Sequence, residues 1–170
     1  MSVRAGWSLQ SGLWAITRCA ASALSLLPLL CALGCRTFPP LPAVNLSEPG
    51  WTVRTGQAVW RPKHETPEIA GDLLLATNPD GRRLVQFTKT PLALIIAQIT
   101  TNSWQIESPA QGKRYSGPGQ PPARVIWFQL SSLLAGAAPP EGWVKQTLGE
   151  ERWRLENRAT GEVLEGYLTQ

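Results

Sequence analysis

From Trp51 onward, apolar and polar residues alternate in short segments separated by turn residues, and this pattern constrains the fold most strongly. Alternation with a period of two is typical of strands that bury one face. Residues 78–81 read Asn-Pro-Asp-Gly, a strong turn signal between the candidate strands 68–78 and 82–88, so we expect a hairpin there. We expect seven or eight strands in all, drawn from these two and from residues 51–61, 94–101, 104–107, 113–116, 143–148, 152–157 and 163–169.

One segment has the periodicity of a helix. Residues 123–135 follow Pro121 and Pro122 and precede Gly136, the usual asymmetry at helix ends. One helical face would carry the apolar residues Ile126, Leu130, Leu133 and Leu134. We therefore predict a mainly β, antiparallel domain over residues 50–170. Its sheet would be strongly curved or a half-open barrel, with the helix packed on or in it as a filler or lid.

The N-terminus has the pattern of an export signal. Residues 1–18 contain Arg4 and Arg18 without an acidic residue, and an apolar run too short to span a bilayer follows at 20–33. Residues 32–35 read Ala-Leu-Gly-Cys, which resembles the lipobox cut by lipoprotein signal peptidase. We predict a signal peptide over residues 1–34 and lipidation of Cys35. A plain signal peptide and an uncleaved anchor are the alternatives.

The residues after the predicted cleavage site indicate where in the cell the protein would be located. Arg36 follows Cys35, whereas in lipoprotein sorting an aspartate at this place retains a protein at the inner membrane. We therefore expect a location in the cell envelope, anchored to the outer membrane and facing the periplasm. Residues 35–49 are rich in proline and read as a tether. In polyproline conformation such a segment reaches about 40 Å.

Composition narrows the classes of function. The three cysteines all lie within the first 35 residues, so the mature chain would have neither disulfides nor thiolate metal sites. After loss of Arg4 and Arg18 it would carry 14 basic and 12 acidic residues, a balance too even to favour nucleic acid.

Catalytic motifs are not evident. The single histidine, His64, lies in a proline-flanked loop, and no nucleophile elbow or phosphate-binding glycine motif occurs. The acidic residues Glu150, Glu151, Glu162 and Glu165 lie at expected hairpin ends, where carboxylates are normally solvated. We predict that the protein is not an enzyme and uses no cofactor or metal. A carboxylate-dependent hydrolase would need two paired acids in a cleft.

The order of the segments resembles the LolA/LolB lipoprotein-carrier fold, and specifically LolB-like outer-membrane lipoproteins shortened at the C-terminus. The resemblance covers residues 68–142 and rests on VQFT at 85–88, KTPL at 89–92, LIIAQ at 94–98, WQIE at 104–107, GKRY at 112–115 and LLAG at 133–136. It implies a half-open β-barrel whose apolar cavity holds acyl chains of client lipoproteins or lipids and aids their membrane insertion. A LolA-like periplasmic carrier would be a partner.

The resemblance also implies roles for particular residues. Leu92 stands where the family carries a leucine that protrudes toward the membrane, although it could equally be the first core residue after Pro91. The acyl cavity would be lined by Leu73, Leu75, Phe87, Ile95, Trp104, Ile106 and Trp127, which could instead form a filled core. With a filled core, the alternative function is a non-enzymatic protein-interaction lipoprotein in cell-envelope assembly.

Overall fold

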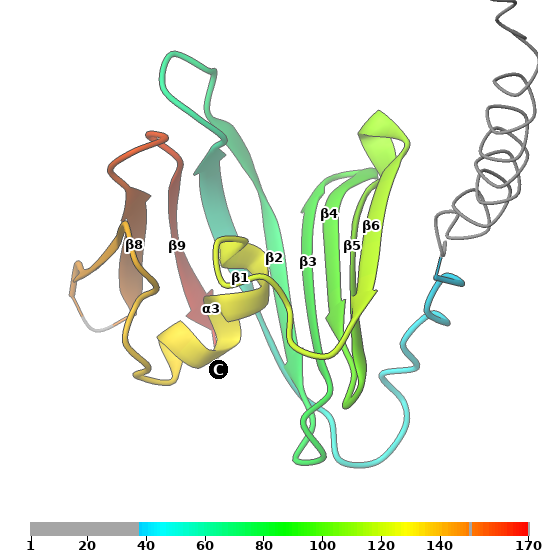
Figure 1. The fold of residues 1–170 in the computed structure, drawn as a ribbon. Coiled ribbons are helices and arrows are strands. Elements are labelled where there is room, and N and C mark those ends of the chain that lie inside the picture. Colours follow the sequence, from blue (N-terminus) through cyan, green and yellow to red (C-terminus); the bar gives the residue numbers. More distant parts are fainter. Residues whose placement is uncertain (1–37, 150, 170) are drawn as a thin grey trace, which may run out of the picture. The chain divides into compact units, whose positions relative to one another are not determined.

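The computed structural model describes residues 38–149 and 151–169, which form a single antiparallel sheet with one α-helix (Figure 1). The predicted mainly β, antiparallel architecture is confirmed. The described residues contain nine strands rather than seven or eight, because every candidate segment pairs, including the short one after Gly112. The elements are β1 (Thr52–Arg61), β2 (Ile69–Thr77), β3 (Arg83–Lys89), β4 (Leu92–Ile99), β5 (Ser103–Ser108), the 3-10 turn η1 (Pro109–Gln111), β6 (Lys113–Pro118), α3 (Ile126–Leu134), β7 (Trp143–Thr147), β8 (Arg152–Asn157) and β9 (Val163–Thr169).

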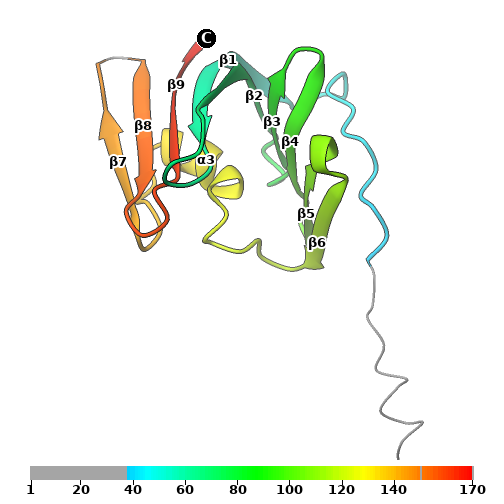
Figure 2. The same ribbon diagram turned by 90° about the horizontal axis from the view of Figure 1, so that it is seen from above.

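The sheet is curved but not closed into a barrel. Its strand order is β6-β5-β4-β3-β2-β1-β9-β8-β7, so the first strand lies in the interior of the sheet, between the second and the last. The edge strands β6 and β7 do not pair with each other, and the strands curve around α3 (Figure 2). None of the helices in the described part of the chain is long and apolar enough to cross a membrane.

The inner face of the sheet forms the core with α3. Direct neighbours across three strands are Leu73, Phe87 and Ile95, all of them buried. The helix begins at Ile126, three residues later than predicted, because Val125 still has an extended backbone. Burial of five of its nine side chains explains why this short segment is stable as a helix.

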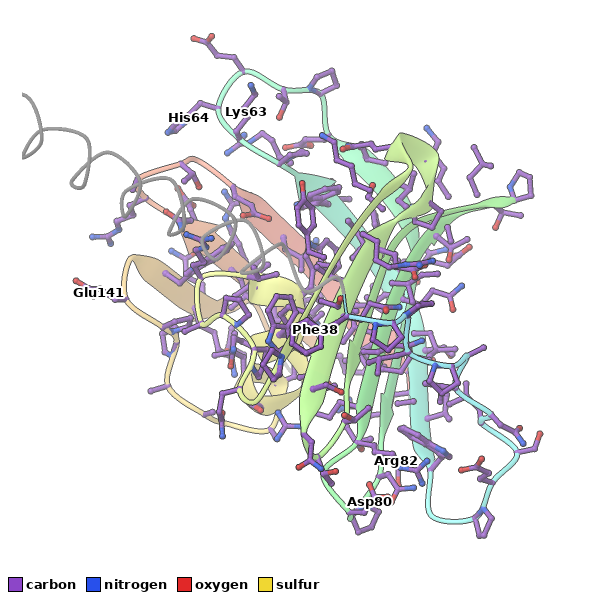
Figure 3. All side chains as sticks on the ribbon, turned by 45° about the vertical axis from the view of Figure 1, so that its right-hand side comes forward. Phe38, Lys63, His64, Asp80, Arg82 and Glu141 are labelled. Atoms are coloured by element: carbon purple, nitrogen blue, oxygen red, sulfur yellow. The ribbon has the colours of Figure 1, made fainter. Side chains whose placement is uncertain are left out.

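The sheet has two ends, which we name by their most exposed turns. The Leu92 end contains the β3–β4 turn, η1 and the loop with Lys63 and His64. The Asp80 end contains the β2–β3 turn, in which the Gly81 N–H donates to Asn78 O at 3.0 Å. Figure 3 shows Lys63 and His64 at one end of the sheet, opposite Asp80 and Arg82 at the other.

Residues 38–50 differ from the expected free tether. The backbone N–H of Leu41 donates to Oε1 of Gln105 at 2.8 Å, and Glu48 forms an ion pair with Arg82 at 3.0 Å. Residues from Phe38 onward belong to the same compact unit as the sheet. We call residues 38–50 the strap. Proline-rich composition predicted an extended backbone, but it carries no information about which surface such a backbone would cover.

Candidate functional site

The β3–β4 hairpin presents Leu92 to solvent. Lys89 pairs with Leu92 across the turn, and the hydroxyl of Thr90 donates to Oδ2 of Asp72 at 3.2 Å. Leu92 is 60% exposed, so it is not a core residue after a proline bend. An exposed leucine beside a lysine at a turn can contact an apolar phase while the ammonium group stays in the polar layer.

The seven residues predicted to line a cavity lie together on the inner face of the sheet or on α3. Leu73, Leu75, Phe87, Ile95 and Trp127 are buried, whereas Trp104 and Ile106 are half-buried and pack against the same cluster. The sequence therefore identified a contiguous apolar surface. A contiguous apolar surface can either line an empty cavity or form a core that is filled by its own side chains.

Aromatic rings fill the region between α3 and the sheet. Trp127 stacks on Phe87 with ring centroids 5.5 Å apart, and Trp60 meets Trp127 edge-on at 5.4 Å. Phe128, the next residue on α3, meets Trp104 at 5.5 Å. These distances correspond to direct packing of aromatic rings. The side chains of α3 therefore fill the space between the helix and the sheet.

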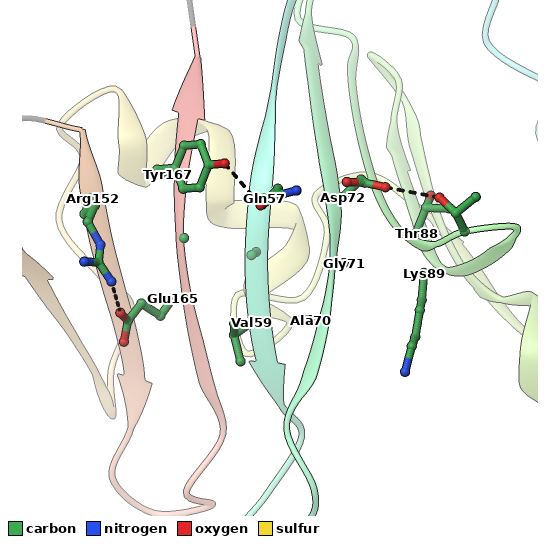
Figure 4. Close-up of a pocket in the computed structure, with 13 residues that line it drawn as sticks. Gln57, Val59, Ala70, Gly71, Asp72, Thr88, Lys89, Arg152, Glu165 and Tyr167 are labelled. Atoms are coloured by element: carbon green, nitrogen blue, oxygen red, sulfur yellow. Dashed lines mark hydrogen bonds and ion pairs between the residues drawn. The ribbon is translucent and has the colours of Figure 1, made fainter.

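The main surface hollows lie elsewhere. A hollow of about 590 Å³ lies on the face of the sheet opposite α3 and includes Val59, Lys89 and Tyr167 in its lining (Figure 4). A second of about 520 Å³ adjoins it, and it includes only Leu73 of the seven predicted residues. Polar contacts cross this face, because the Tyr167 hydroxyl donates to Oε1 of Gln57 at 3.1 Å. Sequence reasoning missed these hollows because the residues around them alternate like any solvated strand face.

Two of the predicted hairpin carboxylates, Glu162 and Glu165, contact side chains of other strands. Glu165 contacts Arg152 and Arg154, each at 3.1 Å. Glu162 accepts a hydrogen bond from Nε1 of Trp60 at 3.0 Å, and burial raises its pKa while that hydrogen bond opposes the rise. Glu162 is therefore half-buried rather than solvated as expected.

The other polar residues to consider are the side chains that could bind a metal ion, and His64. Across the described residues, no three side chains of histidine, cysteine, aspartate or glutamate gather in a way that could hold a metal ion. His64 is exposed, and its backbone N–H donates to Thr160 O at 3.0 Å. The predicted signal peptide over residues 1–34 and the predicted lipidation site Cys35 lie outside the described residues.

No protein-family model matches the sequence, and no curated protein matches it either. The resemblance to LolB-like lipoproteins therefore remains a prediction from motif order.

Proposed function

We propose that this protein is a lipid-anchored lipoprotein of the outer membrane that accepts acyl chains of lipoproteins or lipids and aids their insertion, in the manner expected of a LolB-like protein. The observation that carries the proposal is Leu92, an exposed leucine at the tip of a hairpin in an open, curved sheet. Transfer of acyl chains makes and breaks no bond. Its driving force would be the movement of apolar surface between sites of different depth.

In this proposal α3 acts as a lid. Acyl chains would enter between the helix and the sheet by displacing Trp127 from Phe87, which are stacked in the resting state. The helix is short and is connected by loops on both sides, which favours local opening. Arg83 on β3 donates to the hydroxyl of Ser132 and Lys145 on β7 donates to Leu133 O, so the C-terminal half of α3 would stay attached while its first turn moves away from the sheet. The membrane would be contacted at the same time by Leu92. Burial of one leucine provides about 1.5–3 kcal/mol, enough to bias an anchored domain toward the bilayer without fixing it there.

A second function is favoured by the packed core. The rings of Trp60, Phe87 and Trp127 leave α3 in direct contact with the sheet, as a protein-interaction lipoprotein with a filled core would have. In that case the apolar residues serve stability alone. A partner protein in envelope assembly would then bind the outer surface.

Binding of a fluorescent fatty acid to the chain from residue 36 onward tests the proposal. We expect saturable binding near one probe per chain. Trp127→Ala should tighten it, because truncation opens space between α3 and the sheet. Leu134→Ala, at the end of the same helix, is the matched control and should change the affinity little.

The location of the probe is tested separately. Val59 lies in the outer hollow, so Val59→Glu should leave the affinity unchanged if the probe binds under α3. Loss of binding in Val59→Glu would place the probe on the outer face. Absence of binding by the folded wild-type chain would contradict the carrier function and leave the protein-interaction function.

A further inference from the structure

The outer face of the sheet carries a hollow that the proposed acyl transfer does not use. This outer hollow, of about 590 Å³, extends from Arg152 on β8 to Lys89 on β3. Figure 4 shows it with α3 behind the sheet, so the helix does not fill it. Its volume lies within the range of about 300–1,000 Å³ that is typical of ligand sites.

A row of side chains with hydrogen-bonding groups runs along the outer hollow. Each member lies opposite the next in register, on five neighbouring strands: Arg152, Tyr167, Gln57, Asp72 and Thr88. Residues that lie opposite each other on antiparallel strands share one face of the sheet. Because neighbouring strands are about 4.8 Å apart, the row is about 19 Å long. A ligand that follows the row would therefore be a chain of several units.

Tyr167 provides a flat platform within this row. The residue is 37% exposed, and Figure 4 shows its ring lying over β9 and reaching toward Gln57. Its hydroxyl donates to Oε1 of Gln57 at 3.1 Å, which holds the ring in this orientation. The face of an aromatic ring is apolar and carries partial negative charge, so it attracts C–H groups. One face of a pyranose ring presents such C–H groups.

Polar groups beside the ring have hydrogen-bonding capacity left. Gln57 uses its oxygen toward Tyr167, and Asp72 uses Oδ2, which accepts from the Thr90 hydroxyl at 3.2 Å. Among the described residues, none accepts from Nε2 of Gln57 and none donates to Oδ1 of Asp72. An amide donor and a carboxylate acceptor thus lie side by side. This pair suits hydroxyl groups, which both donate and accept.

The charges around the outer hollow are balanced. Its lining contains two basic residues, Lys89 and Arg152, and two acidic residues, Asp72 and Glu165. Arg152 is also paired with Glu165 at 3.1 Å. Balanced charges produce no field that would attract a phosphate-rich ligand such as nucleic acid or an anionic head group. A neutral polar ligand therefore matches the hollow better than an ion.

A small apolar patch adjoins the amide of Gln57. Val59, two residues further along β1, is 37% exposed and lies opposite Ala70 on β2. Residues two apart on a strand share a face and are about 7 Å apart, so a methyl group on this patch would place an attached amide near Gln57. The carboxamide of glutamine can donate to and accept from such an amide. An N-acetyl group combines a methyl group with a secondary amide.

We propose that the outer hollow binds a glycan of N-acetylated amino sugars. One sugar ring stacks on Tyr167, hydroxyl groups bind Asp72, and an acetamido group contacts Gln57 and Val59. The site goes beyond the proposed acyl transfer and does not depend on it, because acyl chains would bind on the opposite face, under α3. The two ligands can therefore be bound at the same time.

Calorimetric titration of the full chain in detergent tests this site. The probes are chitotetraose, a chain of N-acetylglucosamine, and cellotetraose, which has a hydroxyl in place of each acetamido group. We expect chitotetraose to bind saturably, near one molecule per chain. Cellotetraose should bind several-fold more weakly, because it lacks the methyl and amide groups.

Tyr167→Ala removes the platform and should weaken chitotetraose binding by about tenfold. Tyr115→Ala is the matched control, because Tyr115 is the other tyrosine of the chain, is 60% exposed and lies outside the lining of the hollow. It should leave the affinity unchanged. Gln57→Ala should remove most of the preference for chitotetraose over cellotetraose. If Tyr167→Ala does not retain the wild-type melting temperature, Tyr167→Leu keeps an apolar side chain on the sheet and removes the ring.

The outcomes separate this inference from the proposed function. Absence of chitotetraose binding by the folded chain, or an equal loss in the variants of Tyr167 and Tyr115, would overturn the glycan site. Equal affinities for the two probes would overturn its assignment to N-acetylated sugars. Fatty-acid binding is measured on the same protein, and its absence beside intact chitotetraose binding would contradict the carrier function alone.

Discussion

Leu92 is highly exposed and lies at a turn, so its proposed contact with the bilayer can be tested by a single substitution. Leu92→Glu places a charge where an apolar contact with the bilayer is proposed, so we expect the acylated protein's domain to lose its contact with vesicles. The melting temperature should stay within about 1–2 °C, because exposed surface substitutions change stability little. Quenching of tryptophan fluorescence by brominated lipids measures the contact.

Val53→Glu is the matched control for Leu92. Val53 is also an exposed apolar residue, but it lies on β1 at the Asp80 end. Its substitution should leave lipid quenching unchanged. An equal loss of quenching in both variants would contradict a specific contact at Leu92.

Glu162 predicts a dependence of stability on pH. Its pKa is raised in the folded protein, chiefly by burial, so folding favours the protonated carboxyl group. This contribution is fully present below the unfolded pKa and is lost as the pH rises through the folded pKa. Glu162→Gln keeps an oxygen that can accept from Trp60 and cannot ionise. As the pH rises from 4 to 7, the free energy of unfolding of Glu162→Gln should therefore fall less than that of the wild type.

Equal pH profiles for the wild type and Glu162→Gln would show that the carboxyl group does not titrate with folding. The partners facing this group are Trp60, which donates the hydrogen bond, and the neighbouring loop that carries His64.

At the scale of elements, β1 and β9 approach so closely that glycine is required. A Cβ added to Gly56 would lie 2.0 Å from the carbonyl oxygen of Tyr167, which is backbone and cannot rotate away. Gly56→Ala should therefore destabilise the domain by about 1–3 kcal/mol, as overpacking does. Urea denaturation measures this, with Val59→Ala on the same strand as a control below about 1 kcal/mol. A neutral Gly56→Ala would mean that the two strands separate easily.

Local sequence signals predicted most of the elements, but not what covers them. The Asn-Pro-Asp-Gly turn and the period-two strands were found because their geometry depends on neighbouring residues. The strap was read as a tether because nothing local encodes its contact with Gln105, which is distant in sequence. Likewise, the sequence placed Phe87 and Trp127 on one apolar surface, but only tertiary packing decides whether their rings touch.

At the scale of the whole molecule, the pairing of β1 with β9 joins the two halves of the sheet. A chain that ends before Val163 would leave one edge of β1 unpaired and would lose the buried Leu164 and Leu168. We expect it to show no cooperative thermal transition by circular dichroism. A chain that lacks only Gln170 should unfold like the wild type, and cooperative unfolding of the shorter chain would contradict a central role for β9.

The position of β1 between β2 and β9 also determines the order in which the strands can pair after synthesis. Its pairing with β2 needs only the intervening loop, whereas its other partner, β9, lies about a hundred residues further along. Contacts between segments so far apart form late, because a long loop must close before they contribute. Until the final strand emerges, β1 remains an open edge to which foreign strands could add. The sheet around β1 is therefore completed only after β9 has been made.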